Sequence, residues 1–285
     1  MTGSGPDPSA RATLDAPPRV PLELCGLWRR VSYERPDAPP DTTTRVYWLQ
    51  TPTLYVDLRV PAARDVGACG AGARLEELSD ALLATLATQE GFAGWTSLEG
   101  NLCRWHRDID FQPPSGVPDE GRLEIDGDCI VEHGVHVPYR EVWRRVPGST
   151  GDWLAGRAVG DAASGGRTTY LVAGGDWFLY ARSRRSRELP RTDSLADLIA
   201  ARTLERAELV ELLDFEISLG RRDGGAQPWQ IVLSTLPFRE GATLAPVVRR
   251  SVARDAREPC EARDAEGPCD ARGARTRRTR EATDG

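Results

Sequence analysis

The chain has 285 residues, of which 40% are apolar and 28% charged, and its net charge is −6 at pH 7. This composition is typical of a globular protein with a sizeable core, and the negative charge disfavours a general nucleic-acid-binding role. No apolar run approaches the roughly 18 residues of a membrane span, and the N-terminus lacks the apolar segment of a secretory signal, so we expect a cytoplasmic protein.

The two ends of the chain differ in composition from its middle. Residues 1–20 are rich in Pro, Ser, Asp and Ala, and residues 251–285 contain almost no large apolar residues. Such segments cannot bury enough apolar surface to fold, so we predict two disordered tails. The C-terminal tail carries a basic cluster over 275–280. All 37 basic residues are Arg, which we attribute to base composition rather than to phosphate recognition.

β-Branched and aromatic residues dominate the segments that follow the N-terminal tail, and they predict strands over 24–34, 42–50 and 53–61. The third of these alternates strictly between two kinds of side chain, Leu54, Val56 and Leu58 on one face and Tyr55, Asp57 and Arg59 on the other. This period of two is typical of a half-buried strand.

Leucines at helical spacing predict a helix over 75–91, ended by Gly91. The residues from 91 to 146 then predict a meander of strands, with a turn at 113–116 and a hairpin at Asp126-Gly127.

The order of elements is then repeated. Trp28–Val31 recurs as Trp143–Val146, the strand pair 45–60 has a counterpart at 168–183, and the helix has one at 193–207. Two more strands are predicted over 208–222 and 228–238. The offsets of roughly 115–120 residues favour a duplicated unit over two unrelated β-rich halves of one domain.

Several segments of the first half resemble a lipocalin-like family of calycin barrels, best known from fungi as casein kinase I-interacting proteins. The resemblance begins with Gly26-Leu27-Trp28 and is carried by TLYVDLR (53–59), GFAGW (91–95), WHRDID (105–110) and PDEGRLEIDGD with VEHG and YREVWRR (118–145). It implies a mostly-β chain of two fused antiparallel barrels, each with a short helix, over 21–146 and 147–250. It also implies a protein partner, and it assigns no chemistry.

One predicted strand, 101–111, gathers polar side chains on a single face, because alternate residues of a strand share a face. This face holds Arg104, His106, Asp108 and Asp110 with Leu102. His106 near a carboxylate is a candidate general base or pH-responsive binding group. The alternative, which we favour, exposes this face to solvent and turns Trp105, Ile109 and Phe111 into the core.

A second candidate group follows the hairpin. Glu132, Tyr139 and Glu141 are placed to line a barrel cavity, while Trp28 and Trp143 are expected to be core aromatics whose indole N–H groups bond to the backbone. With His106, the pair His133 and His136 could supply three imidazoles to a metal or to haem. No HxH or HExxH spacing supports such a site, so we predict no metal and no cofactor.

These residues leave three hypotheses for the function. The first, which we favour, is a non-catalytic protein that binds a small apolar or mixed-polarity molecule in the first barrel, because such barrels have room for one ligand. Its candidate binding residues are Tyr55, Trp95, Arg104, His106, Asp108, Glu132, Tyr139 and Glu141. The second is an acid–base isomerase, cyclase or hydratase of a hydrophobic substrate that uses His106, Asp110 and Glu141. The third is a protein-interaction module that uses the barrel exterior and the tails.

Overall fold

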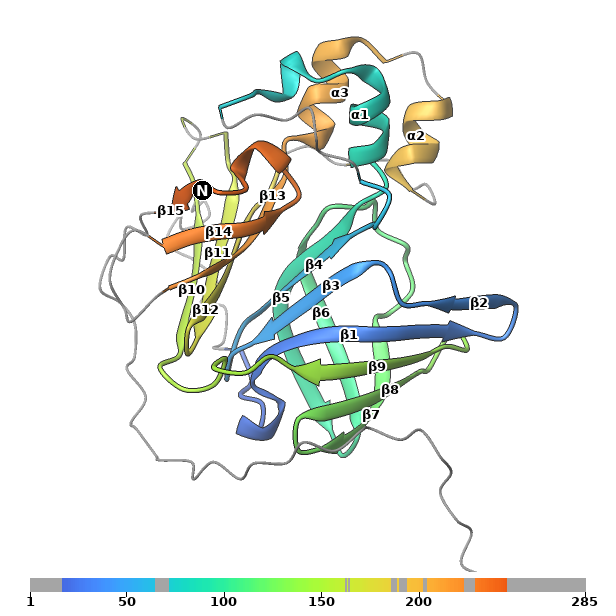
Figure 1. The fold of residues 1–285 in the computed structure, drawn as a ribbon, viewed down its shortest axis with the longest axis vertical. Helices are drawn as coiled ribbons and strands as arrows, with labels where there is room; N and C mark the ends of the chain where they lie inside the picture. The colour runs from blue at the N-terminus through green and yellow to red at the C-terminus, as the bar shows by residue number, and fades with distance from the viewer. Residues whose placement is uncertain are drawn as a thin grey trace, which may run out of the picture.

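The computed structural model describes residues 17–64, 72–161, 163, 165–185, 189, 194–201, 204–222 and 229–244. Two antiparallel sheets and three short α-helices make up this part of the chain (Figure 1). The expected mostly-β architecture is confirmed. The predicted C-terminal tail, its basic cluster and residues 1–16 of the N-terminal tail lie outside the described residues.

The first sheet closes into a barrel of eight strands, because β1 pairs with both β3 and β9 (Figure 1). The strand β2 (Ala38–Asp41) extends the end of β1 as a hairpin. The barrel strands are β1 (Gly26–Arg35), β3 (Arg45–Gln50), β4 (Tyr55–Val60), β5 (Glu90–Glu99), β6 (Leu102–Asp110), β7 (Glu120–Asp126), β8 (Cys129–Gly134) and β9 (Arg140–Arg145).

The second sheet has six strands in sequential order and curls over one side of the barrel as a half-barrel (Figure 1). The second unit is therefore an open sheet rather than a second closed barrel. Its strands are β10 (Leu154–Val159), β11 (Thr168–Gly174), β12 (Trp177–Arg182), β13 (Glu216–Arg221), β14 (Trp229–Ser234) and β15 (Thr243–Leu244).

The three helices gather at one end of the molecule (Figure 1): α1 (Asp80–Leu86), α2 (Leu195–Ala201) and α3 (Arg206–Leu213). The helix α1 begins after Ser79, whose hydroxyl accepts the N–H of Leu82 at 3.3 Å. It is shorter than predicted, and Gly91 does not end it. Gly91 lies in β5, where a Cβ would come within 2.5 Å of Ile217 Cδ1 in the second sheet.

One further expectation is corrected. The leucine-rich start of the predicted strand 208–222 is helical, because it belongs to α3, and β13 begins only at Glu216. The segment Trp143–Val146, which the repeat aligns with Trp28–Val31, lies at the end of the barrel, where β9 pairs with β1 and Trp143 lies opposite Arg30. In both units two strands are followed by helix and then by two more strands, with one α-helix in the first unit and two in the second, and the duplication stays a prediction.

The largest apolar cluster lies between the two sheets and contains residues of both. On β4, Val56, Leu58 and Val60 point out of the barrel into this cluster, and β11, β12 and β13 cover them. The neighbouring Asp57 and Arg59 point into the barrel. The strand is thus buried on both faces rather than half-buried, since its apolar face meets a second sheet and its polar face meets the interior.

Buried polar groups also join the two sheets. Arg184, just after β12, donates to the backbone oxygens of Phe111 at 2.6 Å and of Leu212 at 2.9 Å. Gln89, just before β5, donates to the oxygen of Thr235 at 3.0 Å. Each bond satisfies a backbone carbonyl at the junction, so the shared interior has polar ties as well as apolar contacts.

Candidate functional site

A β-bulge in β5 and β6 decides which side chains enter the barrel. Cys103 and Trp105 point inward, as strand alternation requires, but the register shifts between Ala93 and Gly94. Beyond the shift, Ile109 joins the apolar cluster outside the barrel, while Arg107 stays inside. The extra residue of a bulge moves the later side chains to the opposite face. Gly94 is required there, because a Cβ would lie 1.8 Å from the His106 carbonyl oxygen.

The interior of the barrel holds a cavity of about 360 Å³. Pockets of about 300–1,000 Å³ are the usual size for small-molecule sites. Its lining includes the exposed Thr88, just before β5, and the exposed Glu90, at the start of β5, while a separate part of the barrel interior is filled by the cluster around Trp28. The lining combines aromatic and charged side chains: Arg30, Tyr33, Asp41, Thr44, Trp48, Asp57, Arg59, Pro61, Thr88, Glu90, Phe92, Trp105, Arg107, Asp119, Glu132, Tyr139, Glu141 and Trp143.

Three guanidinium groups line the cavity, and each is held between two carboxylates. Arg30 pairs with Glu141 at 2.6 Å and with Asp41 at 3.0 Å. The other two pairings are Arg59 with Asp57 (2.8 Å) and Glu90 (3.9 Å), and Arg107 with Asp119 (2.6 Å) and Asp110 (2.9 Å). These pairs hold the arginines in place and leave the cavity with more carboxylates than cations.

Glu132 differs from the other carboxylates of the lining. It accepts hydrogen bonds from the Tyr139 hydroxyl at 2.6 Å and from the Trp143 indole N–H at 3.1 Å. Among the described residues, no Arg lies within ion-pair distance of it, and it is only 4% exposed. Its direct neighbour across the strands is Glu141 on β9. A second buried carboxylate therefore faces it in place of a counter-ion.

This setting changes the acidity of two lining carboxyls. Burial, and then the charge of Glu141, raises the pKa of Glu132 well above its usual range. Burial also raises the pKa of Asp57 to about 6, although the Arg59 charge opposes this shift. Both carboxyls consequently bind a proton more readily than an exposed carboxyl does, and both face the cavity.

Aromatic rings form the wall between these charges. Trp48 packs edge-on against Trp105 and Trp143, with ring centroids 5.5 and 5.9 Å apart. Trp48 is 1% exposed, and its indole N–H has no hydrogen-bond partner among the described residues. The Trp28 N–H bonds to the Leu24 oxygen at 2.8 Å, as predicted. The Trp143 N–H bonds to Glu132 instead of to the backbone, which corrects the expectation for that residue.

The structure brings part of the predicted binding set together. Glu132, Tyr139 and Glu141 all line the cavity, because β8 and β9 present alternate side chains to it. Tyr55 lies buried next to Phe92 in the filled part of the barrel, at 6.0 Å between centroids. Asp110 ends β6 as the second carboxylate of Arg107, and burial raises its pKa.

The other predicted residues lie on the outside of the barrel. Trp95 stacks on His106 at 5.3 Å, and the His106 Nε2 contacts the Ser97 hydroxyl at 2.9 Å. Asp108 faces the second sheet, where it accepts from Arg157 and from the Tyr170 hydroxyl, both at 2.8 Å. Arg104 pairs with Glu120 on the outer surface.

The three imidazoles are not gathered into one site. His133 lies 3.7 Å from Glu124, and His136 contacts Glu120 at 2.9 Å, while His106 packs on Trp95. No group of three His, Cys, Asp or Glu in the described part of the chain is placed to hold a metal ion.

Several lining residues were not singled out by the sequence. Asp57, Arg59 and Asp119 belong to segments whose role in a cavity depends on which strand face turns inward. The arginines carry no signal of their own in a chain whose basic residues are all Arg. The alternation of Asp57 and Arg59 with apolar residues was the one available clue.

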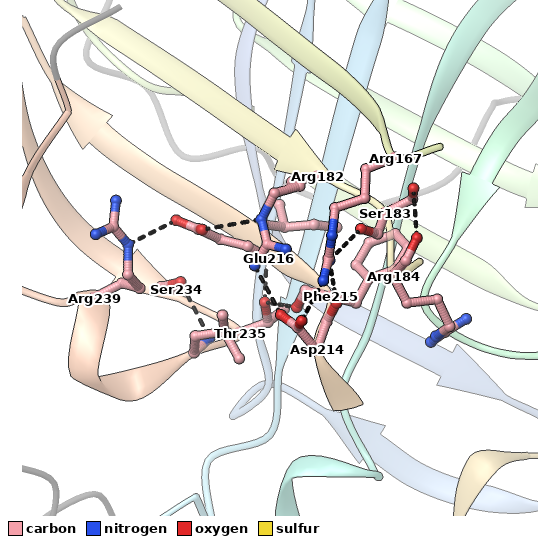
Figure 2. A network of polar contacts seen from close by, with 12 residues as sticks. Arg167, Arg182, Ser183, Arg184, Asp214, Phe215, Glu216, Ser234, Thr235 and Arg239 are labelled. Atoms are coloured by element: carbon pink, nitrogen blue, oxygen red, sulfur yellow. Dashed lines mark hydrogen bonds and ion pairs between the residues drawn. The ribbon is translucent and has the colours of Figure 1, made fainter. Parts of the chain in front are cut away.

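A second, more open hollow of about 450 Å³ lies against the second sheet. Figure 2 shows its polar network, in which Asp214 pairs with Arg167 and Arg182, and Glu216 accepts from the Nε of Arg239 at 2.9 Å. These groups are bonded to one another, as the arginines of the barrel cavity are to its carboxylates.

No family model and no curated protein matches the sequence. Comparison with solved structures finds an uncharacterized protein from Saccharomyces cerevisiae that is 14% identical to this chain. The match covers 73% of this chain and 84% of that protein, with a TM-score of 0.46. A lipocalin-like protein from Bacteroides uniformis is 13% identical over 44% of this chain and 99% of its own, with a TM-score of 0.28. An uncharacterized protein from Bacteroides eggerthii is 10% identical. That match covers 43% of this chain and 98% of that protein, with a TM-score of 0.27.

One of these three proteins is described as lipocalin-like, and none is described by an activity. The relation to casein kinase I-interacting proteins stays a prediction. No helix in the described residues is both long and apolar enough to cross a bilayer.

Proposed function

We propose that this chain is a non-catalytic binding protein that holds one small molecule of mixed polarity inside the closed barrel. The proposal rests on the cavity of about 360 Å³. Its wall contains both tryptophan rings and charged groups that are held in place by ion pairs. A barrel used only as a structural support would fill its interior with apolar side chains. A wholly apolar ligand is disfavoured here, because it would bury the lining charges without partners.

The ion pairs support ligand binding. Arg30, Arg59 and Arg107 are fixed by carboxylates on neighbouring strands, which pre-organises the wall before a ligand arrives. Pre-organised groups lower the entropy cost of binding. The outward position of His106 removes the expected imidazole base from the cavity.

One observation favours an acid–base enzyme as a second candidate. Glu132 faces the cavity with a raised pKa, which is the property of a group that donates or accepts a proton near neutral pH. In that case Glu132 would carry the reaction, and Glu141, held by Arg30, would tune it. A substrate that is chemically changed by the wild type and only bound by Glu132→Gln would establish this candidate.

The proposal is tested by native mass spectrometry of protein purified gently from its own host. We expect a stoichiometric extra mass that is lost on denaturation. Trp105→Phe alters the cavity wall and should lower its occupancy, whereas Trp95→Phe changes the same residue type on the outer face and should not. Two results together would contradict the proposal. The protein would carry no extra mass, and no fraction of the host's small molecules would change its melting temperature.

A further inference from the structure

One cysteine of the barrel is covalently joined to a part of the chain outside the described residues. Cys129 is disulfide-bonded, whereas Cys25 and Cys103, the other cysteines that the structure describes, are free. The chain contains six cysteines, so the partner of Cys129 is one of the remaining three. These are Cys69, Cys260 and Cys269.

Cys129 faces away from the cavity, on the outer wall of the barrel. It is the first residue of β8, on which Ile130 packs in the barrel interior and Glu132 lines the cavity. Because alternate side chains of a strand share a face, Cys129 points to the opposite side. The disulfide therefore belongs to the outer wall and not to the proposed ligand site.

Cys69 is too far from Cys129 to be its partner. It lies four residues before Ala73, which packs against the apolar cluster between the sheets and precedes η2 (Leu75–Glu77) at the helical end of the molecule. Four extended residues span at most about 14 Å. Cys129 follows the β7–β8 hairpin at the opposite end of the barrel (Figure 1), and the 10 residues of β5 extend roughly 33 Å between these ends. The Cα atoms of a disulfide lie within about 7 Å of each other, which rules out Cys69.

The C-terminal part of the chain is long enough to reach Cys129. Leu244 is the last described residue, and the chain from there to Cys260 spans up to roughly 50 Å when it is extended. Cys260 and Cys269 have the same local sequence, since each follows a proline and precedes an acidic residue in EPCEAR (258–263) and GPCDAR (267–272). Either cysteine therefore brings carboxylates to the outer wall.

The outer wall beside Cys129 is basic. Arg144 on β9 lies directly opposite Cys129, and Arg29 on β1 lies directly opposite Arg144. Neither arginine has an ion pair within the described part of the chain, whereas both other arginines of β9 are paired. Like charges directly across two strands are destabilising. An acidic segment placed against this wall would reduce their repulsion, so the charge of the wall complements the residues that flank the two candidate cysteines.

We propose that the C-terminal segment 258–270 is latched to the outer wall of the barrel by a disulfide between Cys129 and Cys260 or Cys269, with its acidic residues toward the basic wall of β1 and β9. The bond makes this segment a redox-sensitive cover of the wall, because reduction releases it. The inference goes beyond the proposed binding function and does not depend on it.

Closing the latch is a two-electron oxidation. The two thiols lose two protons and two electrons as the bond between their sulfurs forms. A small disulfide such as oxidised glutathione accepts them and leaves as two thiols, through a mixed disulfide. Dithiothreitol reverses the step.

A tryptic map of the full chain identifies the pairing, because trypsin cleaves after arginine and places each candidate cysteine in its own peptide. The protein is equilibrated with oxidised glutathione, blocked with N-ethylmaleimide and digested without reductant. We expect peptide 123–140, which holds Cys129, to be joined to 258–263 or to 264–272 and to separate on reduction. Peptide 123–140 joined to 65–74 or to a second copy of itself, or carrying maleimide or glutathione, would overturn the inference.

Variants test the latch in the whole protein. On a denaturing gel without reductant, the wild type should migrate faster than its reduced form, because the link compacts the unfolded chain. Cys69→Ser is the matched control and should keep this difference, whereas Cys129→Ser should lose it. Circular dichroism checks that both variants are folded. A difference in migration that Cys129→Ser retains would contradict the latch.

The basic wall is tested by combining Arg29→Gln with Arg144→Gln. The ratio of latched to reduced protein, titrated against the glutathione redox couple at low salt, should fall by roughly threefold or more, and added salt should lower the wild-type ratio. Arg35→Gln, which changes an exposed arginine at the far end of β1, is the control. A double variant that latches as well as this control would overturn the role of the wall.

Discussion

Glu132 on β8 lies directly opposite Glu141 on β9, and both carboxyls are buried in the wall of one cavity. Like charges directly across two strands are destabilising. The structure offsets this repulsion unequally: Arg30 pairs with Glu141, whereas Tyr139 and Trp143 donate to Glu132. The two carboxyls are neighbours in the sheet, but one is paired with a cation and the other is bonded only to neutral donors.

The stability of the protein should depend on the charge of Glu132. Its pKa is raised in the folded state, so the fold keeps a proton that the unfolded chain loses above about pH 4.3. The contribution of Glu132 to the free energy of unfolding of the wild type is complete below that pH. It is lost as the pH rises through the pKa that Glu132 has in the folded protein. We expect Glu132→Gln to cost about 1 kcal/mol at pH 4, through an imperfect hydrogen bond. At pH 9 it should stabilise the protein relative to wild type.

Urea denaturation at both pH values measures this difference. Glu124→Gln on β7 is the matched control, because Glu124 is exposed and its replacement should have little effect at either pH. A Glu132→Gln effect that is the same at pH 4 and pH 9 would be inconsistent with a raised pKa.

Loss of Arg30 should be severe. Its side chain and that of Glu141 are 7% and 4% exposed, and removing one partner of a buried ion pair costs roughly 3–5 kcal/mol. We expect Arg30→Met to destabilise the protein by about this amount, and Arg30→Met with Glu141→Met to recover much of it. Chemical denaturation of the double-mutant cycle gives the coupling, and a single-variant cost below about 1 kcal/mol would argue against the pair.

The bulge at Gly94 tolerates no side chain. A Cβ there would lie 1.8 Å from the His106 carbonyl oxygen, a backbone atom that cannot move aside alone. We expect Gly94→Ala to destabilise the protein by roughly 2–4 kcal/mol. Gly156→Ala on β10 is the control, since its nearest contact would be 3.9 Å away. Thermal melts of the two variants should differ clearly, and similar melts would mean that the strands relax around the added methyl group.

Asp108 should stabilise the contact between the sheets rather than the cavity. Replacing it with Asn weakens its bonds to Arg157 and to the Tyr170 hydroxyl, at a cost of about 1 kcal/mol. Amide exchange in β10 and β11 should become faster, while ligand occupancy stays unchanged. Asp126→Asn, at an exposed hairpin, serves as the control. Unchanged exchange in β10 would show that this contact does not hold the sheets together.

The two sheets should unfold together, because one apolar cluster contains residues of both. Ile217 on β13 is fully buried in it, and Ile217→Ala should cost roughly 2–4 kcal/mol. Hydrogen exchange should then lose protection in β4 as well as in β12. Val232→Ala, at a position that is 43% exposed, should change little. Two separate unfolding transitions, or an effect confined to the second sheet, would contradict a shared core.

Strand pattern predicted much of the fold and part of the site. The alternation in β4 was visible in the sequence, and so was the shared face of Tyr139 and Glu141. Alternation cannot say which face turns inward, because a second sheet can bury the outer face as fully as the barrel buries the inner one. The polar face of β6 with His106 therefore lies outside the barrel.

The contacts that could not be predicted from the sequence join residues far apart in the chain. The contact between Arg30 and Glu141 joins residues 111 positions apart, and that between Asp108 and Tyr170 joins residues 62 apart. Neither has a local signature. The bulge at Gly94 had none either, since its glycine is required by the carbonyl of a neighbouring strand rather than by a turn.

The two faces of β4 have separate tasks. Val56 and Leu58 hold the sheets together, whereas Asp57 and Arg59, on alternate positions of the same six-residue strand, face the cavity. Exchanging the inward residues would change the charge and shape of the cavity wall and leave the contact between the sheets in place. The cavity wall of this barrel can for this reason be redesigned one inward residue at a time while the outer wall stays constant.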